Sequence, residues 1–131
     1  MTYIQPNDLR NWWEWVRPGL IKIKTKSSEA WIPEDVYADC YSQRSALWVL
    51  FSNDKPVGFV VLQPSGEALH VWCGFAYEGN WMETAWEHIK GICRVQGFKR
   101  VTFDSNRRGW DKVAGKMGFK PRRWVAEIEK E

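Results

Sequence analysis

The stretch EALHVWCGF holds two side chains that could do proton chemistry. Histidine is the side chain that most often serves as a general base, so the imidazole of His70 could act as one. Glu67 offers a carboxylate three residues earlier. Strict strand alternation puts His70 on the face of Trp72, opposite Val71 and Cys73. The alternative is that His70 is a strand histidine that is simply packed or half-exposed.

The three cysteines, Cys40, Cys73 and Cys93, lie far apart, and the chain contains no CxxC pair. Neither His70 nor His88 stands at a metal-binding spacing from them. We therefore expect no metal site, and reduced thiols that fill space in the core. No triad, P-loop or zinc signature is present either.

The stretch FAYEGNWMETAW predicts a turn at Glu78-Gly79-Asn80 with a helix after it. Asn80 is a suitable N-cap, and Glu83 three residues later completes a capping-box pattern. Backbone N–H groups at such a helix start can bind phosphate. Glu83 would repel an anion there, however, and no Lys or Arg occurs between Gly66 and His88.

Positive charge is concentrated near the end of the chain. The segment Lys99–Arg123 holds nine Lys or Arg against two Asp, a charge of +7, whereas the whole chain carries +3. This segment could contact nucleic acid or an acidic partner, with Arg107-Arg108 and Arg122-Arg123 on phosphates. The alternative is a solvated charged face.

The composition predicts one folded domain, residues 1–131. Aromatic residues make up 15% of the chain and ten are Trp, which excludes a disordered chain. No run of about 18 apolar residues occurs, so we expect no membrane span. The start, MTYIQPNDLR, lacks the layout of a signal peptide, which predicts a cytoplasmic protein.

Two helices are expected in the first third of the chain. The first, capped by Asn7 or Asp8, should run to about Arg17 and end at Pro18-Gly19, which leaves Leu20–Lys24 as a loop or weak strand. Trp15 falls outside the apolar arc of this helix, so it is the better candidate for an exposed contact. A second helix, residues 33 to 43, starts at a proline followed by acids.

The apolar runs ALWVLFS, VGFVVLQ and EALHVWCGF predict three strands, joined by the turns NDKP and PSG into an antiparallel meander. The first two are apolar throughout, which indicates burial on both faces. A helix to Gln96 then precedes the strand FKRVTFD, and this implies a parallel strand pair. A short helix and a last strand complete the order ααβββαβαβ. The fold class is α/β (α+β), a mixed central sheet with an antiparallel meander, a parallel strand pair and helices on both faces.

This order is similar to that of the Gcn5-related N-acetyltransferase (GNAT) superfamily. The passage RVQGFKRVTF resembles its helix, glycine and strand. The passage SNRRGWDKVAGKMGFKP resembles its Asn-initiated helix that ends in Gly-Phe, with Asn106, Gly118 and Phe119 at matching positions. The resemblance covers about residues 45 to 127. The segment GFVVLQPSGEALHVWCGF also resembles short GNAT-like proteins encoded by tailed bacteriophages.

The resemblance implies an acetyl-CoA site at the turn. The candidate cofactor-binding residues are Phe75, Ala76, Tyr77, Gly79, Asn80 and Asn106. It also implies a base on the preceding strand, for which Glu67 and His70 are the candidates. The family's two loop glycines, however, correspond to about Trp81 and Glu83, and its general-acid tyrosine corresponds to Ala114. These departures indicate that the acetyl-CoA loop is degenerate.

Three functions are compatible with these residues. We favour a non-catalytic GNAT-like protein that binds a protein partner, which by the phage resemblance is a virion component or a host factor, in the bacterial host cytoplasm or the virion. The first alternative is a divergent acetyl-CoA-dependent N-acetyltransferase, in which His70 or a water near Glu67 deprotonates the amine. The second is a nucleic-acid-binding accessory protein that uses Lys99–Arg123.

Overall fold

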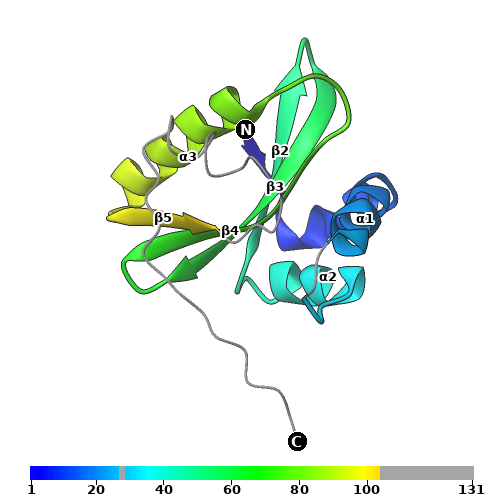
Figure 1. The fold of residues 1–131 in the computed structure, drawn as a ribbon, viewed down its shortest axis with the longest axis horizontal. Helices are drawn as coiled ribbons and strands as arrows, with labels where there is room; N and C mark the ends of the chain where they lie inside the picture. The colour runs from blue at the N-terminus through cyan, green and yellow to red at the C-terminus, as the bar shows by residue number, and fades with distance from the viewer. Residues whose placement is uncertain (27–28, 104–131) are drawn as a thin grey trace, which may run out of the picture.

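The computed structural model describes residues 1–26 and 29–103, which form a five-stranded sheet with helices on both faces (Figure 1). The strands, in spatial and chain order, are β1 (Thr2–Tyr3), β2 (Ala46–Ser52), β3 (Lys55–Ser65), β4 (Ala68–Ala76) and β5 (Arg100–Phe103). Strands β1 to β4 are antiparallel neighbours, whereas β4 and β5 run parallel. The predicted mixed sheet, with its meander and parallel pair, is confirmed.

The helices form two layers around this sheet. They are η1 (Pro6–Asp8), α1 (Leu9–Thr25), α2 (Pro33–Tyr41) and α3 (Met82–Gln96). Helices α1 and α2 cover one face and α3 covers the other (Figure 1). The predicted short helix and last strand, with Asn106, Ala114, Gly118 and Phe119, lie outside the described residues. In the described part of the chain, no helix is long and apolar enough to cross a membrane.

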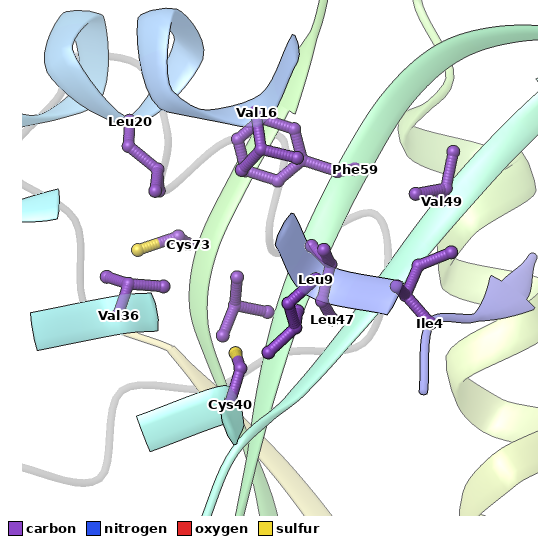
Figure 2. Packing of buried hydrophobic residues seen from close by; sticks show 11 residues of the cluster. Ile4, Leu9, Val16, Leu20, Val36, Cys40, Leu47, Val49, Phe59 and Cys73 are labelled. Carbon is purple, nitrogen blue, oxygen red and sulfur yellow. The ribbon is translucent and has the colours of Figure 1, made fainter. Parts of the chain in front are cut away.

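Two buried clusters lie on opposite faces of the sheet. The cluster under α1 and α2 consists of Ile4, Leu9, Val16, Leu20, Val36, Cys40, Leu47, Val49, Phe59, Val61 and Cys73 (Figure 2). The cluster under α3 consists of Val60, Leu62, Leu69, Ile89 and Cys93. Strand β3 therefore contributes alternate side chains to both clusters. Burial of its two faces, which its apolar run predicts, is confirmed.

Helix α1 continues through Pro18 to Thr25, so the predicted end at Arg17 and the predicted loop or strand at Leu20–Lys24 are wrong. A proline inside a helix costs about 3 kcal/mol because it removes a backbone hydrogen bond. Leu20 is fully buried and points from α1 into the cluster of Figure 2. Tertiary packing of the second half of the helix therefore outweighs the local effect of Pro18.

Trp15 is half-buried, so its predicted exposure is also wrong. Its ring centroid lies 4.7 Å from that of Tyr77 and 6.2 Å from that of Phe59. The helix leaves Trp15 at the edge of its apolar arc, and aromatic rings from β3 and from the end of β4 reach it there. The Trp15 ring therefore packs against the cluster under α1 and α2.

The end of the second helix and the first hairpin turn lie close to their predicted positions. Helix α2 ends at Tyr41, two residues before the predicted 43, and Gln43 has a φ of +67°. The turn between β2 and β3 is confirmed, with positive φ at both Asn53 and Asp54, as a two-residue hairpin of type I′ requires. Strand β1 was not predicted, because two residues carry no alternation that could be read.

Strand β4 carries one extra residue opposite β3. Val61 pairs with Cys73, whereas Leu62 pairs with Val71, so Trp72 is the bulged residue. Val71 packs against the cluster under α3, and Cys73 packs in the cluster under α1 and α2. The predicted placement of Val71 and Cys73 on one face is wrong, because the bulge shifts the alternation by one residue.

Candidate functional site

The end of β4 is fixed to the middle of α1 by Tyr77. Its backbone N–H donates to the Val57 carbonyl at 2.8 Å, which extends the sheet by one residue. Its hydroxyl accepts from the Gly19 N–H at 3.2 Å and donates to the Trp15 carbonyl. Burial raises the pKa of Tyr77, and the hydrogen bond from Gly19 opposes this in part. The side chain thus inserts into the backbone ladder of α1 beside Pro18.

The turn after Tyr77 closes on its own side chains. Asn80 Oδ1 accepts from the Met82 N–H at 3.2 Å, and the Trp81 indole N–H donates to the Glu78 carbonyl. Gly79 has a φ of +67°, and a Cβ there would lie 3.3 Å from Trp81 Nε1. The indole of Trp81 therefore covers Gly79, and one N–H group at the start of α3 already has its acceptor.

The capping box predicted for Asn80 and Glu83 does not form. Helix α3 begins at Met82 with Trp81 as its N-cap, so Glu83 is its second residue, and no side-chain cap hydrogen bond is made. The side chain of Asn80 instead closes a short turn with the next residue but one. The helix start lies one residue later than predicted.

The charges around the turn are mainly negative. Glu78 is paired with Lys55 at 2.7 Å, and both side chains are more than half exposed. Glu83 is exposed in the first turn of α3. An acid in a first turn is favourable for the helix dipole and unfavourable for a second anion at the same place. The contact between Lys55, which follows the β2–β3 turn, and Glu78 could not be predicted from the spacing of residues along a strand.

His70 lies in a polar row that crosses three strands. Its Nδ1 is 2.8 Å from Thr102 Oγ1 of β5, and its register neighbour on β3 is Gln63. Gln63 Nε2 donates to Asp39 Oδ2 of α2 at 3.4 Å, so this row faces α1 and α2. Asp39 also accepts from the buried Ser45 hydroxyl at 3.3 Å. Sequence reasoning found His70 and missed the others, because register and tertiary contact bring them together.

Glu67 lies at the opposite end of β4 from the turn. Its carboxylate pairs with Lys99 at 3.2 Å and with Arg100 at 3.6 Å. Nine residue steps of strand separate it from Ala76, a distance of about 30 Å. The structure therefore does not bring Glu67 to the turn. Lys99 and Arg100 are the residues of the basic segment that the structure describes, and both have Glu67 as an acidic neighbour.

Phe75 and Ala76, the other candidates at the turn, are the last residues of β4. Phe75 pairs with Phe59 of β3, and the Lys22 ammonium lies 5.7 Å from the centroid of its ring. Within the described residues, β5 pairs with β4 from Ala68 to Val71. Asn106 lies outside the described residues. Those residues contain no group of three His, Cys, Asp or Glu that could hold a metal ion.

A pocket that the sequence analysis did not identify lies between α1 and α2. It has a volume of about 280 Å³ and is lined by Arg10, Trp13, Glu34 and Tyr37. Arg17 donates to Glu34 at 3.0 Å, and this hydrogen bond lowers the pKa of Glu34. The i, i+3 spacing of Arg10 and Trp13 on α1, and of Glu34 and Tyr37 on α2, is the sequence signal that could have revealed a shared face.

No protein-family model matches the chain, and no curated protein matches it. Solved structures do match, over nearly the full length of both chains. A probable acetyltransferase shares 16% identity with a TM-score of 0.67, over 92% of this chain and 95% of that one. The ribosomal-protein-alanine N-acetyltransferase from Brucella melitensis biovar Abortus 2308 shares 11% identity with a TM-score of 0.66, over 99% and 96%. The chain has the GNAT fold.

A third structure with this GNAT fold is the aminoglycoside N-acetyltransferase AAC(6')-Iy, solved in complex with CoA. It shares 11% identity with a TM-score of 0.68, over 98% of this chain and 92% of that one. Identities this low establish the fold alone, because one fold hosts many functions. The function therefore depends on the residues of this chain's own site.

Proposed function

We propose that this GNAT-fold protein is a non-catalytic interaction protein whose β4–α3 turn does not hold acetyl-CoA. The observation that carries the proposal is the closure of the turn by its own side chains. A phosphate-binding turn needs free N–H groups and close backbone approach. Here Asn80 takes the Met82 N–H, and the Trp81 indole covers Gly79.

The charges of the turn support the same conclusion. The pyrophosphate of CoA is an anion, and it would meet the exposed Glu83 in the first turn of α3. Glu78 adds a second carboxylate whose neighbour, Lys55, is already engaged. Because no Lys or Arg occurs between Gly66 and His88, the turn itself supplies no cation.

We infer that the partner is a protein. The chain has ten Trp, and Trp, Tyr and Arg dominate the residues that carry binding energy in protein interfaces. The resemblance of GFVVLQPSGEALHVWCGF to GNAT-like proteins of tailed bacteriophages makes a virion component or a host factor the partner we propose.

Calorimetric titration with acetyl-CoA tests the proposal. The aminoglycoside N-acetyltransferase AAC(6')-Iy, which was solved in complex with CoA, serves as the positive control. We expect saturable heat from the control and none from this chain. The proposal would be rejected if this chain bound acetyl-CoA saturably and the variant Gly79→Trp, which places a bulky side chain in the turn, did not.

The second candidate is a divergent N-acetyltransferase, which the His70 and Thr102 pair favours. An imidazole held at 2.8 Å from a hydroxyl on the α1 and α2 face could deprotonate an amine only through a chain of waters, because five residue steps of β4, about 16 Å, separate His70 from Phe75. The amine would then attack the thioester carbon of acetyl-CoA and release the CoA thiolate. The backbone N–H of Ala76 would polarise the carbonyl. The Tyr77 N–H is taken by Val57, and strand alternation directs the Phe75 N–H to β3 as well.

Release of free CoA thiol in the presence of varied amines tests this second candidate. His70→Gln keeps a polar side chain and removes the imidazole. Glu67→Gln is the control, because it removes a carboxylate just before β4, at the end of the strand away from the turn. Turnover lost in the first variant and kept in the second would establish the enzyme with His70 as its base. The absence of turnover in the parent protein would reject it.

A further inference from the structure

Helices α1 and α2 present two matched rows of side chains beside each other. Arg10, Trp13 and Arg17 follow one another on α1 at i, i+3 and i+7, and Glu34, Tyr37 and Tyr41 do so on α2. The rows run in opposite directions. Arg17 pairs with Glu34 at 3.0 Å at one end, and the Trp13 and Tyr37 rings meet in the middle with centroids 5.0 Å apart.

The aromatic floor of this groove continues along α2. Tyr41 stacks on Tyr37 with an interplanar angle of 9° and is 57% exposed. Ile32, just before α2, is 50% exposed. Trp13 and Tyr37 are half-buried and pack against the core, so their rings are held in place before any partner arrives. A rigid aromatic floor costs little ordering entropy on binding.

The charges of the groove are unequal at its two ends. Glu34 is neutralised by Arg17 at one end. At the other end Arg10 is exposed, and among the described residues it makes no ion pair. Glu14, four residues after Arg10, is exposed and lies beside Arg10 on the surface of α1, but within the described range 1–26 no ion pair joins the two side chains. An apolar floor with one free guanidinium at its rim is complementary to an apolar side chain beside a carboxylate.

We propose that the groove lined by Arg10, Trp13, Glu34 and Tyr37 is the docking surface for a protein partner, which inserts an aromatic side chain flanked by an acidic residue. The inference rests on the proposed function, since it names the surface that the interaction protein uses. The aromatic side chain would fill the pocket of about 280 Å³ against Trp13 and Tyr37. The carboxylate would pair with Arg10, and guanidinium and carboxylate match in planar geometry.

Three capped tripeptides test the groove: acetyl-Asp-Trp-Asp-amide, acetyl-Lys-Trp-Lys-amide and acetyl-Asp-Ala-Asp-amide. Each is titrated into ¹⁵N-labelled full-length protein, and the amide and indole signals are followed by NMR. We expect Asp-Trp-Asp to give saturable shifts confined to the groove. Lys-Trp-Lys should bind about fivefold more weakly, because that factor corresponds to the loss of one exposed ion pair. Asp-Ala-Asp should give no saturable shift.

The variant Arg10→Glu should reverse the preference between the two Trp peptides. Arg10 is exposed, so its replacement leaves the fold intact, and circular dichroism checks this. Lys99→Glu makes the same charge change beside β5, away from the groove, and should leave the preference unchanged. If both variants alter it equally, the preference reflects net charge and the inference is wrong.

Two further results would overturn the inference. One is the absence of saturable groove shifts with Asp-Trp-Asp, and the other is tighter binding of a short oligothymidylate to the same groove signals, which would indicate a surface for nucleobases. The proposed function fails by a different readout, namely shifts of Gly79 and its neighbours on addition of acetyl-CoA. The two failures are therefore distinguishable in one set of spectra.

Discussion

The hydroxyl of Tyr77 accepts a hydrogen bond from the Gly19 N–H at 3.2 Å and thereby joins the end of β4 to the middle of α1. The same hydroxyl donates to the Trp15 carbonyl. Pro18 lies between these two helical residues and lacks an N–H of its own. The turn that could hold a cofactor in this fold is thus tied to a helix that the proline alone would have ended.

Tyr77→Phe should lower the free energy of unfolding by about 1–2 kcal/mol, because the Gly19 N–H and the Trp15 carbonyl lose a partner in a half-buried position. Urea denaturation monitored by circular dichroism measures the change. Tyr41→Phe removes a hydroxyl from an exposed ring and should stay within about 0.5 kcal/mol of the parent. Equal stability of the two variants would contradict the role given to the Tyr77 hydroxyl.

Gly19→Ala should destabilise the protein although alanine favours helices. A Cβ at Gly19 would lie 2.8 Å from the Phe59 ring and 2.9 Å from both Phe75 and Tyr77. Overpacking of this kind costs about 1–3 kcal/mol. Gly91→Ala in α3 is the matched control, since nothing lies within 4 Å of its Cβ. It should stabilise by about 0.5–1 kcal/mol, and the same sign in both variants would contradict the packing.

Asn80→Ala should cost about 0.5–1 kcal/mol, because the Met82 N–H loses its acceptor at the start of α3. Glu83→Ala should change stability less, since Glu83 forms no capping box. Thermal unfolding of both variants measures the difference. A larger loss with Glu83→Ala would restore the capping box that the sequence pattern suggests.

Burial, and to a smaller extent the neighbouring Asp39, raises the pKa of Cys40 to about 12. The pKa of a thiol in an unfolded chain is about 8.5, so the folded state binds the Cys40 proton more tightly than the unfolded state does. The stabilising contribution is complete below that pH and is lost as pH rises towards 12, by up to about 1.4 kcal/mol per pH unit. Urea unfolding at pH 8 and pH 10 should therefore show a smaller loss in Cys40→Ala than in the parent. An identical loss would contradict the burial effect.

The meander, the parallel pair and the two helix layers could be predicted because they depend on local patterns. The apolar runs of β2 and β3 and the Asn53-Asp54 turn carry that information within a few residues. The end of α1 could not be predicted, because Pro18 and Gly19 are local stop signals. What overrides them is contact with Phe59, Phe75 and Tyr77, about 40 or more residues away along the chain.

The candidate site was predicted only in part for the same reason. His70 was identifiable from its residue type, whereas its neighbours Thr102 and Gln63 follow from strand register. The bulge at Trp72 adds one residue to β4 and reverses which face the later side chains use. No alternation pattern marks it, because Val71, Trp72 and Cys73 are all apolar.

The central claim is that the turn at Gly79 does not hold acetyl-CoA, and a thermal melt with and without millimolar acetyl-CoA tests it most directly. A ligand at about 100 times its dissociation constant adds roughly 2.7 kcal/mol, which raises the Tm of a domain of this size by several degrees. We predict the same Tm with and without acetyl-CoA. A Tm that rises with acetyl-CoA concentration, and does not rise in Gly79→Trp, would contradict the claim.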